Sequence, residues 1–202
     1  MRGVEQIPWA YDALIRLFPG LARWRSDLVA MAHGRVLEVG CGTGLALREY
    51  AHRTDLAWGI DPAADSLRRA ARRVPSAGLA VASAEHLPFT DASFDCVVSS
   101  LVFCSVPDPA RGLNEIRRVL KPEGRLLMLE HVQASSRLPA RLLDLIQPPW
   151  TAMSGGCHPN RHTEREVEAA GFRIDPATRR ARGVMRLFVA YPCAVSSTVA
   201  RP

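Results

Sequence analysis

The sequence is poor in lysine, has no closely spaced cysteine pair and contains no long apolar run. Its single lysine is Lys121, so arginine supplies almost all the positive charge of a chain with net charge +6. The five cysteines include no Cys-x-x-Cys pair, so we interpret them as reduced thiols and expect no metal site. No run reaches the roughly 18 apolar residues of a transmembrane span, and the N-terminal segment lacks the apolar core of a signal peptide. We therefore expect a cytoplasmic protein.

The arginines are dispersed, with short clusters at residues 68–69, 72–73 and 179–180. A basic chain is attracted to anionic surfaces such as phospholipid. Because no aromatic RNA motif or zinc-binding spacing accompanies these arginines, we expect no nucleic-acid partner. At 202 residues the chain is long enough for one domain with a substantial core.

The chain is organised around GRVLEVGCGTG, residues 34–44. The apolar first half is typical of a strand buried in a parallel sheet, and a helix is predicted over residues 45–52. Strand, glycine turn and helix place backbone N–H groups against an anionic group. The turn has the spacing G-x-G-x-G at Gly40, Gly42 and Gly44, one residue short of the dinucleotide motif. A pyrophosphate needs the longer turn, whereas an amino-acid carboxylate fits the tighter one.

Glu38 lies inside the same predicted strand. A carboxylate beneath a glycine turn would repel a pyrophosphate but could hold an ammonium group, directly or through water. A ligand that carries both an ammonium and a carboxylate, such as the methionine half of S-adenosylmethionine, fits this pairing. A satisfied polar residue at a strand end explains Glu38 equally well, and the sequence leaves both interpretations open.

Asp61 follows a second predicted strand, residues 56–60. The tip of this strand is where a nucleoside ribose presents two hydroxyls, and one carboxylate can accept hydrogen bonds from both. A helix with arginines on its exposed side is predicted next, over residues 63–74.

Strands and helices continue to alternate, which predicts a mainly parallel seven-stranded sheet with helices on both faces. In such a sheet the pocket lies at the carboxyl ends of the strands. A turn is predicted at residues 121–124, and the last two strands are expected to form an antiparallel hairpin at one edge. The remaining predicted strands are residues 79–82, 94–100, 125–130, 172–174 and 184–191, and the remaining helices are residues 107–120 and a final helix from the capping candidate Thr163 to Gly171.

Two segments flank this core. Two helices are predicted over residues 4–33, where tryptophan and phenylalanine alternate with arginine. This pattern is expected of helices that pack on the sheet, of an amphipathic cover over a ligand pocket or of a membrane-facing element. Residues 132–160 are irregular after a candidate helix over 137–146, and such a long connection suits a lid or an acceptor-recognition loop. We expect a single domain over residues 1–202, divided into an N-terminal cover (1–33), a cofactor-binding core (34–131), an acceptor-side lid (132–163) and the final helix with edge strands (164–202).

Four ordered motifs within residues 34–131 resemble the class I S-adenosylmethionine-dependent methyltransferases: VLEVGCGTG, GIDP, SAEHLPF before SFDCVVSS, and RVLKPEGRLLMLEH. The resemblance implies a Rossmann-like α/β fold and a methyltransferase (EC 2.1.1.-) that converts S-adenosyl-L-methionine to S-adenosyl-L-homocysteine. Ser83 stands where the family usually has an acidic residue. The resemblance implies cofactor contacts at Tyr11, Glu38, Gly40, Cys41, Gly42, Gly44, Asp61, Pro62, Ser83, Ala84, Glu85, Ser100 and Leu101.

A narrower likeness concerns the acceptor. LVFCSVPDP, LEHV, the Pro149-Trp150 pair and GGCHPNRHT are similar to small enzymes that methylate alkyl thiols. The stretch from the fourth strand to LEH is also similar to bacterial phosphatidylethanolamine N-methyltransferases. We therefore expect a small, lipophilic acceptor, a thiol or a similar group, with phospholipid N-methylation as the alternative. Peripheral membrane association stays open, and the sequence does not indicate an oligomeric state.

Methyl transfer from a sulfonium needs alignment of the reacting atoms and exclusion of water. A general base is needed only where the acceptor arrives protonated. His131, just past the fifth predicted strand, is the best-placed base, although a strand-end hydrogen bond would also explain it. Trp150, His158 and Arg161 are candidates for the acceptor side, Arg161 as a ligand of an acceptor phosphate or carboxylate or as a capping residue.

Two other functions compete with methyl transfer. A nicotinamide-dependent oxidoreductase would also use Asp61 on a ribose, but the short glycine turn, Glu38 and the absence of a Tyr-x-x-x-Lys pair argue against it. A non-catalytic module that keeps the fold and the cofactor stays open, because a sequence cannot show turnover.

Overall fold

The computed structural model describes residues 19–133, 144–149, 151, 156–158 and 160–193. Tyr11, Trp150, the helix expected before residue 19 and most of the expected lid therefore lie outside the described residues. Within the described part, no helix is long and apolar enough to cross a membrane.

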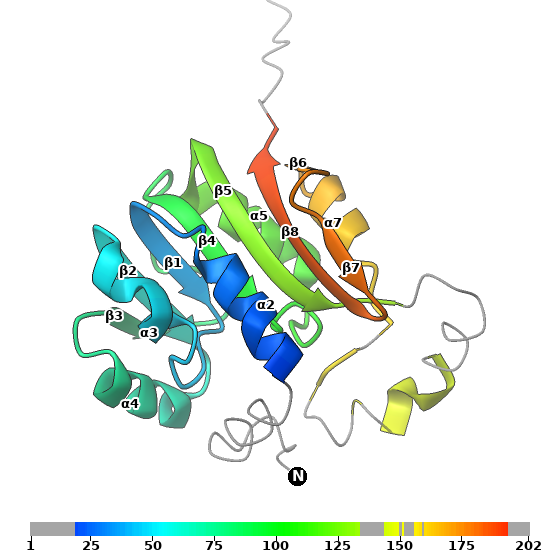
Figure 1. Cartoon of the computed structure of the whole chain (residues 1–202), viewed down its shortest axis with the longest axis horizontal. Helices are drawn as coiled ribbons and strands as arrows, with labels where there is room; N and C mark the ends of the chain where they lie inside the picture. Colours follow the sequence, from blue (N-terminus) through cyan, green and yellow to red (C-terminus); the bar gives the residue numbers. More distant parts are fainter. Residues whose placement is uncertain (1–18, 134–143, 150, 152–155, 159, 194–202) are drawn as a thin grey trace, which may run out of the picture.

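One twisted sheet forms the centre of the molecule, with helices on both faces (Figure 1). Its strand order is β3-β2-β1-β4-β5-β8-β6, and β7 pairs with β8 on the same edge as β6. The strands are β1 (Arg35–Val39), β2 (Leu56–Asp61), β3 (Gly78–Val81), β4 (Phe94–Ser100), β5 (Leu120–His131), β6 (Phe172–Ile174), β7 (Arg180–Arg182) and β8 (Met185–Pro192). The helical elements are α2 (Pro19–Val29), α3 (Leu47–Tyr50), the 3₁₀ turn η2 (Ala51–Arg53), α4 (Ala64–Arg73), α5 (Pro109–Val119) and α7 (Thr163–Ala169), and residues 144–149 are also helical.

The sheet confirms the prediction of a mainly parallel, seven-position fold. The pairs β1–β2, β1–β4, β2–β3 and β4–β5 are parallel, whereas β8 runs antiparallel to β5 and β6. The prediction of the edge was incomplete, because it lacked β7. This short strand forms a tight hairpin with β8, and β6 and β7 share the outermost position by pairing with different parts of β8.

Two apolar clusters lie on opposite faces of the sheet. On one face, α5 contributes Leu113, Ile116 and Val119, which are all fully buried at helical spacing. On the other face, α2 and α3 pack their apolar sides, including Leu28 and Leu47, against the strands (Figure 1). Burial of each such side chain contributes about 1.5–3 kcal/mol, so both faces hold the central strands in place.

Two predicted helix starts were wrong. The helix expected from residue 107 begins at Pro109, because Asp108 takes a non-helical conformation and its side chain accepts a hydrogen bond from Arg111 N at 3.0 Å. Proline at the first helical position suits this cap. Thr163 was expected to cap the last helix, but it is the first helical residue and fully buried, and His162 occupies the cap position without a side-chain hydrogen bond.

The turn expected at residues 121–124 is part of β5 instead. Leu120 pairs with Phe94, the register then shifts, and Arg125 pairs with Cys96. The irregular segment is fastened by Lys121, whose Nζ lies 2.5 Å from an oxygen of the Asp95 carboxylate. Four residues of β5 thus stand opposite the single β4 residue Asp95, an irregularity larger than the one extra residue of an ordinary β-bulge, and regular pairing of the two strands follows from Arg125.

Candidate functional site

The glycine turn follows β1 and has a backbone conformation that favours glycine. The φ angles are 67° at Gly40, 53° at Gly42 and 76° at Gly44. A Cβ at Gly40 would lie 2.5 Å from a side-chain atom of Val102, so only glycine lets this turn approach the loop after β4. Cys41 N donates a hydrogen bond to the carbonyl of the β2 residue Ile60 at 2.9 Å, which fixes the turn against the neighbouring strand.

The turn lines a cavity of about 1000 Å³, whose lining includes residues at the carboxyl ends of β1, β2 and β4. These strand ends point toward the lower side of the sheet in Figure 1. Most of the residues predicted to contact a cofactor line this cavity: Glu38, Gly40, Cys41, Gly42, Asp61, Pro62, Ser83, Ala84, Glu85, Ser100 and Leu101. Gly44 is not among the lining residues; a Cβ there would lie 3.2 Å from Cβ of Ala70, where α4 packs against the turn. The ligand contacts of all these residues stay predictions.

Asp61 joins two loops at the end of β2. One carboxylate oxygen accepts a hydrogen bond from Gly42 N at 3.0 Å, and the other accepts one from Ala63 N at 2.8 Å. Burial raises the pKa of Asp61, although the two backbone hydrogen bonds act in the opposite direction. A carboxylate offers about four acceptor positions, so Asp61 keeps capacity for two ribose hydroxyls while it holds the glycine turn.

Glu38 is buried at the base of the cavity, with only 3% of its surface exposed. The hydroxyl of Tyr50, at the end of α3, donates a hydrogen bond to its Oε2 at 3.0 Å. Burial raises the pKa of Glu38 to about 8, against the lowering effects of Tyr50 and of the nearby Arg25. A neighbouring cation would favour the ionised form of this carboxyl, and its role toward an ammonium group stays a prediction.

The described helix of the N-terminal cover is α2, which contacts both the core and the cavity. Leu28 packs in the core, whereas Leu21 and Arg25 line the cavity. An ion pair between Arg25 and Glu49 at 3.2 Å holds α2 near the glycine turn. The helix therefore both packs on the sheet and covers part of the cavity, two roles that are alternatives from the sequence alone.

The loop after β4 forms the opposite wall of the cavity, where Leu101, Val102 and Val106 contribute apolar surface. Leu101 has a φ of 60°, which is uncommon for a residue with a side chain. Its N–H donates a hydrogen bond to the carbonyl of Leu129 at 2.7 Å. The loop thus depends on contacts with β5 for its conformation.

Hydrogen bonds to the side chain of Glu130, on β5, hold this loop in place. Its Oε1 accepts hydrogen bonds from Ser99 Oγ at 2.9 Å and from the N–H groups of Val102 and Phe103, both at 3.1 Å. The carboxyl is fully buried, and burial raises its pKa. Neither Glu130 nor Tyr50 was recognised in the sequence, because each acts on a partner far away in the chain.

The loop after β3 is joined to the start of α5. Asp108 N donates a hydrogen bond to the carboxylate of Glu85 at 3.3 Å, and the side chains of Arg111 and His86 are in contact. These four residues line the cavity together, on the β3 side. Glu85, expected beside an adenine, is thus also a structural link.

The described residues expected on the acceptor side do not line the cavity. Arg161 Nη1 donates a hydrogen bond to the carbonyl of Val106 at 2.7 Å and a second to the carbonyl of Phe103, so this guanidinium group fastens the loop after β4. His158 N donates to the carbonyl of Cys104 at 2.7 Å, and its ring Nδ1 lies 2.9 Å from the amide nitrogen of Gln147. Their roles toward an acceptor stay predictions.

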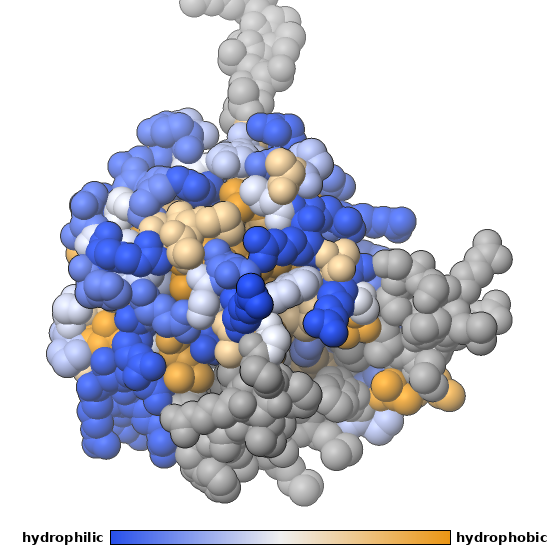
Figure 2. Space-filling model, viewed as in Figure 1, coloured by the Kyte–Doolittle hydropathy of each residue, from blue (hydrophilic) through white to orange (hydrophobic). Residues whose placement is uncertain are grey.

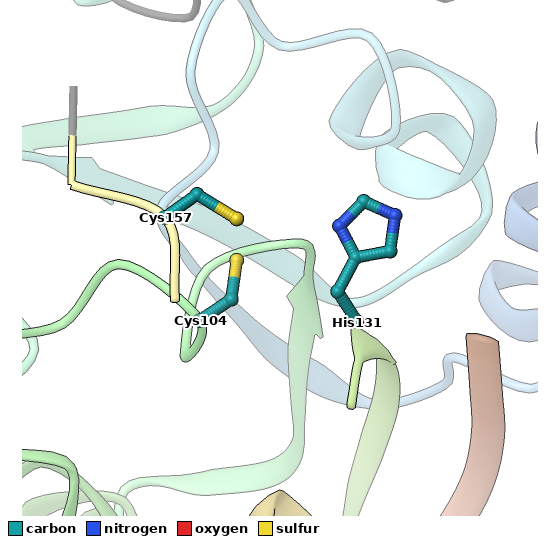
Figure 3. Close-up of side chains that lie close together, drawn as sticks. All are labelled: Cys104, His131 and Cys157. Carbon is teal, nitrogen blue, oxygen red and sulfur yellow. The ribbon is translucent and has the colours of Figure 1, made fainter. Parts of the chain in front are cut away.

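His131, the expected base, also lies off the wall of the cavity. Its ring lies beside the thiols of Cys104 and Cys157, which face each other (Figure 3). One ligand atom from each of the three side chains lies within 4.8 Å of the others. The hydrogen bond with Cys157, followed by burial, raises the pKa of the Cys104 thiol. Sequence spacing gave no sign of this group, since its members come from three distant segments.

Comparisons with known proteins agree with this geometry. Residues 37–128 match the family described as "Methyltransferase domain". The chain is 31% identical to a demethylmenaquinone methyltransferase of Thermotoga maritima over 166 residues, which cover 77% of this chain and 72% of that protein. The YcgJ protein of Bacillus subtilis has a similar fold, with a TM-score of 0.70, 15% identity, and coverage of 86% of this chain and 100% of that chain.

Two further relatives have other acceptors in their names. The chain is 34% identical to the thiol S-methyltransferase TMT1B of Rattus norvegicus over 68% of its own length and 59% of the relative. It is 39% identical to a phosphatidylethanolamine N-methyltransferase of Cereibacter sphaeroides over 48% of its own length and 51% of the relative. It thus spans about half to three fifths of these two proteins. From the matched motifs, the sheet and the Thermotoga relative together, the chain belongs to the class I S-adenosylmethionine-dependent methyltransferases.

Proposed function

We propose that this methyltransferase transfers the methyl group of S-adenosylmethionine to the sulfur of a small lipophilic thiol. The observation that carries the proposal is the apolar wall formed by Leu101, Val102 and Val106 at the tip of β4. Among the cavity-lining residues from position 100 to 107, none is charged. A charged acceptor would lose its hydration where it contacts this wall, because the charged lining residues Glu85, Asp108 and Arg111 lie on the β3 side of the cavity.

The residues on the β1 and β2 side fit the cofactor. The glycine turn lines the cavity and lies close against Val102, and the buried Glu38 carboxyl gains a favourable partner when an ammonium group lies nearby. Asp61 would hold the ribose hydroxyls. When bound, the cofactor supplies an electrophilic methyl group on a sulfonium, so the protein must align the acceptor and exclude water.

A thiol is the acceptor that depends least on a general base. Its unperturbed pKa of about 8.5 leaves a few per cent as thiolate at neutral pH, and a thiolate is strongly nucleophilic. An ammonium headgroup, in contrast, must lose a proton whose pKa lies higher. The described lining residues from 100 to 107 include no carboxylate or imidazole, whereas Glu85, His86 and Asp108 line the β3 side of the cavity. The loop after β4 therefore suits a thiol better than an amine.

An exposed apolar surface on the helical stretch 144–149 is consistent with a lipophilic acceptor. Leu145 is 76% exposed and Ile146 is 39% exposed, both on the helical stretch 144–149. Figure 2 shows apolar surface where this stretch lies in Figure 1, whereas the surface over α4 is strongly hydrophilic. Peripheral contact with a membrane remains a prediction that rests on such apolar positions.

The relatives support two candidates. Similarity to TMT1B favours a thiol acceptor. The identity to the phosphatidylethanolamine N-methyltransferase is higher but covers a shorter stretch, and it favours a phospholipid amine as the second candidate. The Thermotoga relative adds a quinone-type acceptor to those that need testing.

The test supplies methyl-labelled S-adenosylmethionine and three acceptors in parallel: a short alkyl thiol, phosphatidylethanolamine vesicles and a reduced demethylmenaquinone. Label in an extractable thioether supports the proposal. Label in the lipid headgroup or in the quinone instead overturns it and identifies the acceptor class. Cofactor binding by calorimetry without label in any product also contradicts the thiol proposal. An Asp61→Ala variant, expected not to bind the cofactor, measures the label that reaches each acceptor without catalysis.

A further inference from the structure

We propose that Cys104, His131 and Cys157 form a binding site for a divalent metal ion of the zinc class. The inference concerns a side-chain group outside the cavity and does not rest on which acceptor is methylated.

The geometry of the group suits one ion. Cys104 comes from the loop after β4, His131 is the last residue of β5, and Cys157 belongs to the described segment 156–158. Their ligand atoms lie within 4.8 Å of one another, with the two thiols face to face and the imidazole beside them (Figure 3). Ligand atoms around a tetrahedral zinc lie roughly 3.4–3.8 Å apart, given bonds of about 2.0–2.3 Å. A small side-chain adjustment therefore brings the group to coordination distances.

The ligand types select the metal. Two thiols and an imidazole form a soft to borderline set, which favours zinc and disfavours magnesium or calcium, whose ligands are oxygen atoms. Both cysteines are buried and His131 is half-buried, so the ion would be shielded from water on the protein side. Among the described residues three ligands gather here, which leaves the fourth position of a tetrahedral ion to a water molecule.

A second observation is the carboxylate of Glu130, the residue before His131. Its Oε1 holds the loop after β4, but its Oε2 is buried and accepts no hydrogen bond from the described residues. The charge of this carboxylate acts on both His131 and Cys104, so it lies close to the proposed ligands. A cation held by the three ligands would attract this carboxylate, whose Oε2 has no hydrogen-bond donor among the described residues.

The ion would join segments that already touch. His158 N donates a hydrogen bond to the carbonyl of Cys104 at 2.7 Å, and Arg161 holds the carbonyls of Phe103 and Val106. Coordination of Cys104 and Cys157 would add a stronger link to the same loop, which carries the apolar wall of the cavity. The expected role is therefore to fix the acceptor side of the site, not to take part in methyl transfer.

Binding has a defined proton balance. Each thiol loses one proton when it coordinates as a thiolate, and the neutral imidazole binds through a ring nitrogen, so one ion displaces two protons and no electron is transferred. A disulfide between Cys104 and Cys157 is the competing fate of the same two thiols. That reaction would need an oxidant, and it would prevent coordination.

The test is a cobalt titration of the reduced, chelator-treated full chain under inert gas. We expect one Co²⁺ per chain, with thiolate-to-metal charge-transfer absorption and intense visible bands of a tetrahedral ion, and we expect Zn²⁺ to displace it. Calorimetry in two buffers of different ionisation enthalpy should count two protons released per ion. A reduced wild-type chain without these bands, or one whose isolated form contains a Cys104–Cys157 disulfide and binds no metal after reduction, overturns the proposal.

Matched variants locate the site. Cys104→Ser, Cys157→Ser and His131→Gln should each weaken cobalt binding at least tenfold, with the charge-transfer absorption about halved or lost in the two serine variants. Cys193→Ser removes an exposed thiol and should leave the titration unchanged. An equal loss in Cys193→Ser would show that binding is not specific to the group. Circular dichroism checks the fold of each variant, and the wild-type titration stands even where a variant fails to fold.

Discussion

Asp61, at the tip of β2, accepts a hydrogen bond from Gly42 N at 3.0 Å and so holds the glycine turn that follows β1. The residue expected to bind the ribose therefore also shapes the loop expected to bind the methionine moiety. Replacement of one side chain should affect both halves of the cofactor site.

Asp61→Ala should abolish measurable binding of S-adenosylmethionine in calorimetry. It removes the ribose acceptor and leaves Gly42 N and Ala63 N without their partner, at a cost of about 1–3 kcal/mol for each donor that stays buried. Asp61→Asn keeps one acceptor oxygen and should bind the cofactor more weakly than wild type but better than Asp61→Ala. Near-normal affinity in Asp61→Ala would remove this residue from the site.

The cofactor affinity should rise with pH because of Glu38. Its pKa in the free protein is about 8, so below that pH the carboxyl is protonated and an ammonium ligand must displace the proton. Affinity should therefore increase from about pH 5 to pH 8 and then level off. Glu38→Gln should bind more weakly and show a flatter profile. Parallel profiles for the two proteins would contradict the assignment.

The same group has the opposite effect on the unliganded protein. A folded-state pKa near 8, above the ordinary value of 4.5, means that the stabilising contribution of the protonated carboxyl is present at low pH and is lost as the pH rises through 8. In thermal denaturation, the stability of the wild type relative to Glu38→Gln should therefore fall as the pH rises from about 4.5 to about 8. A pH-independent difference would show that Glu38 has an ordinary pKa.

Tyr50→Phe should destabilise the protein by about 1–3 kcal/mol in denaturant unfolding, because Oε2 of the buried Glu38 loses its hydrogen-bond donor. Tyr191→Phe, at a half-buried position on β8, is the matched control and should change little. Equal effects of the two substitutions would indicate that the Tyr50 hydroxyl makes no specific contribution.

Arg161→Met should lower turnover several-fold while cofactor affinity stays within about twofold. The substitution frees the carbonyls of Phe103 and Val106 and so loosens the wall expected to face the acceptor, but it leaves the glycine turn intact. Arg165→Ala removes a neighbouring exposed arginine as a control. Loss of cofactor affinity in Arg161→Met would place the residue on the cofactor side.

The parts of the fold that the sequence predicted well depend on local patterns. The strands β1, β2 and β4 follow from apolar runs, and the turn at residues 40–44 follows from its glycines. The errors arose where the backbone conformation depends on distant contacts. Residues 121–124 were predicted as a turn but lie within the bounds of β5, at the register shift between the Leu120–Phe94 and Arg125–Cys96 pairs.

The candidate site shows the same division. Glu38 and Asp61 were found because each lies next to a recognisable turn or strand end. Tyr50, Glu130 and the group of Cys104, His131 and Cys157 were missed, because a hydrogen bond or a cluster between separate segments leaves no periodic trace in the sequence. Trp150 and Tyr11 lie outside the described residues, so their expected roles stay predictions.

The two edges of the sheet differ in how they resist unwanted strand addition. At one edge, β6 and β7 together cover the ends of β8, so an incoming chain meets only two three-residue strands. At the other edge, β3 is four residues long and ends at Val81, which is 64% exposed. Short strands offer few free backbone groups for pairing between molecules. Substitutions that lengthen β3 would therefore be expected to promote aggregation before they affect catalysis.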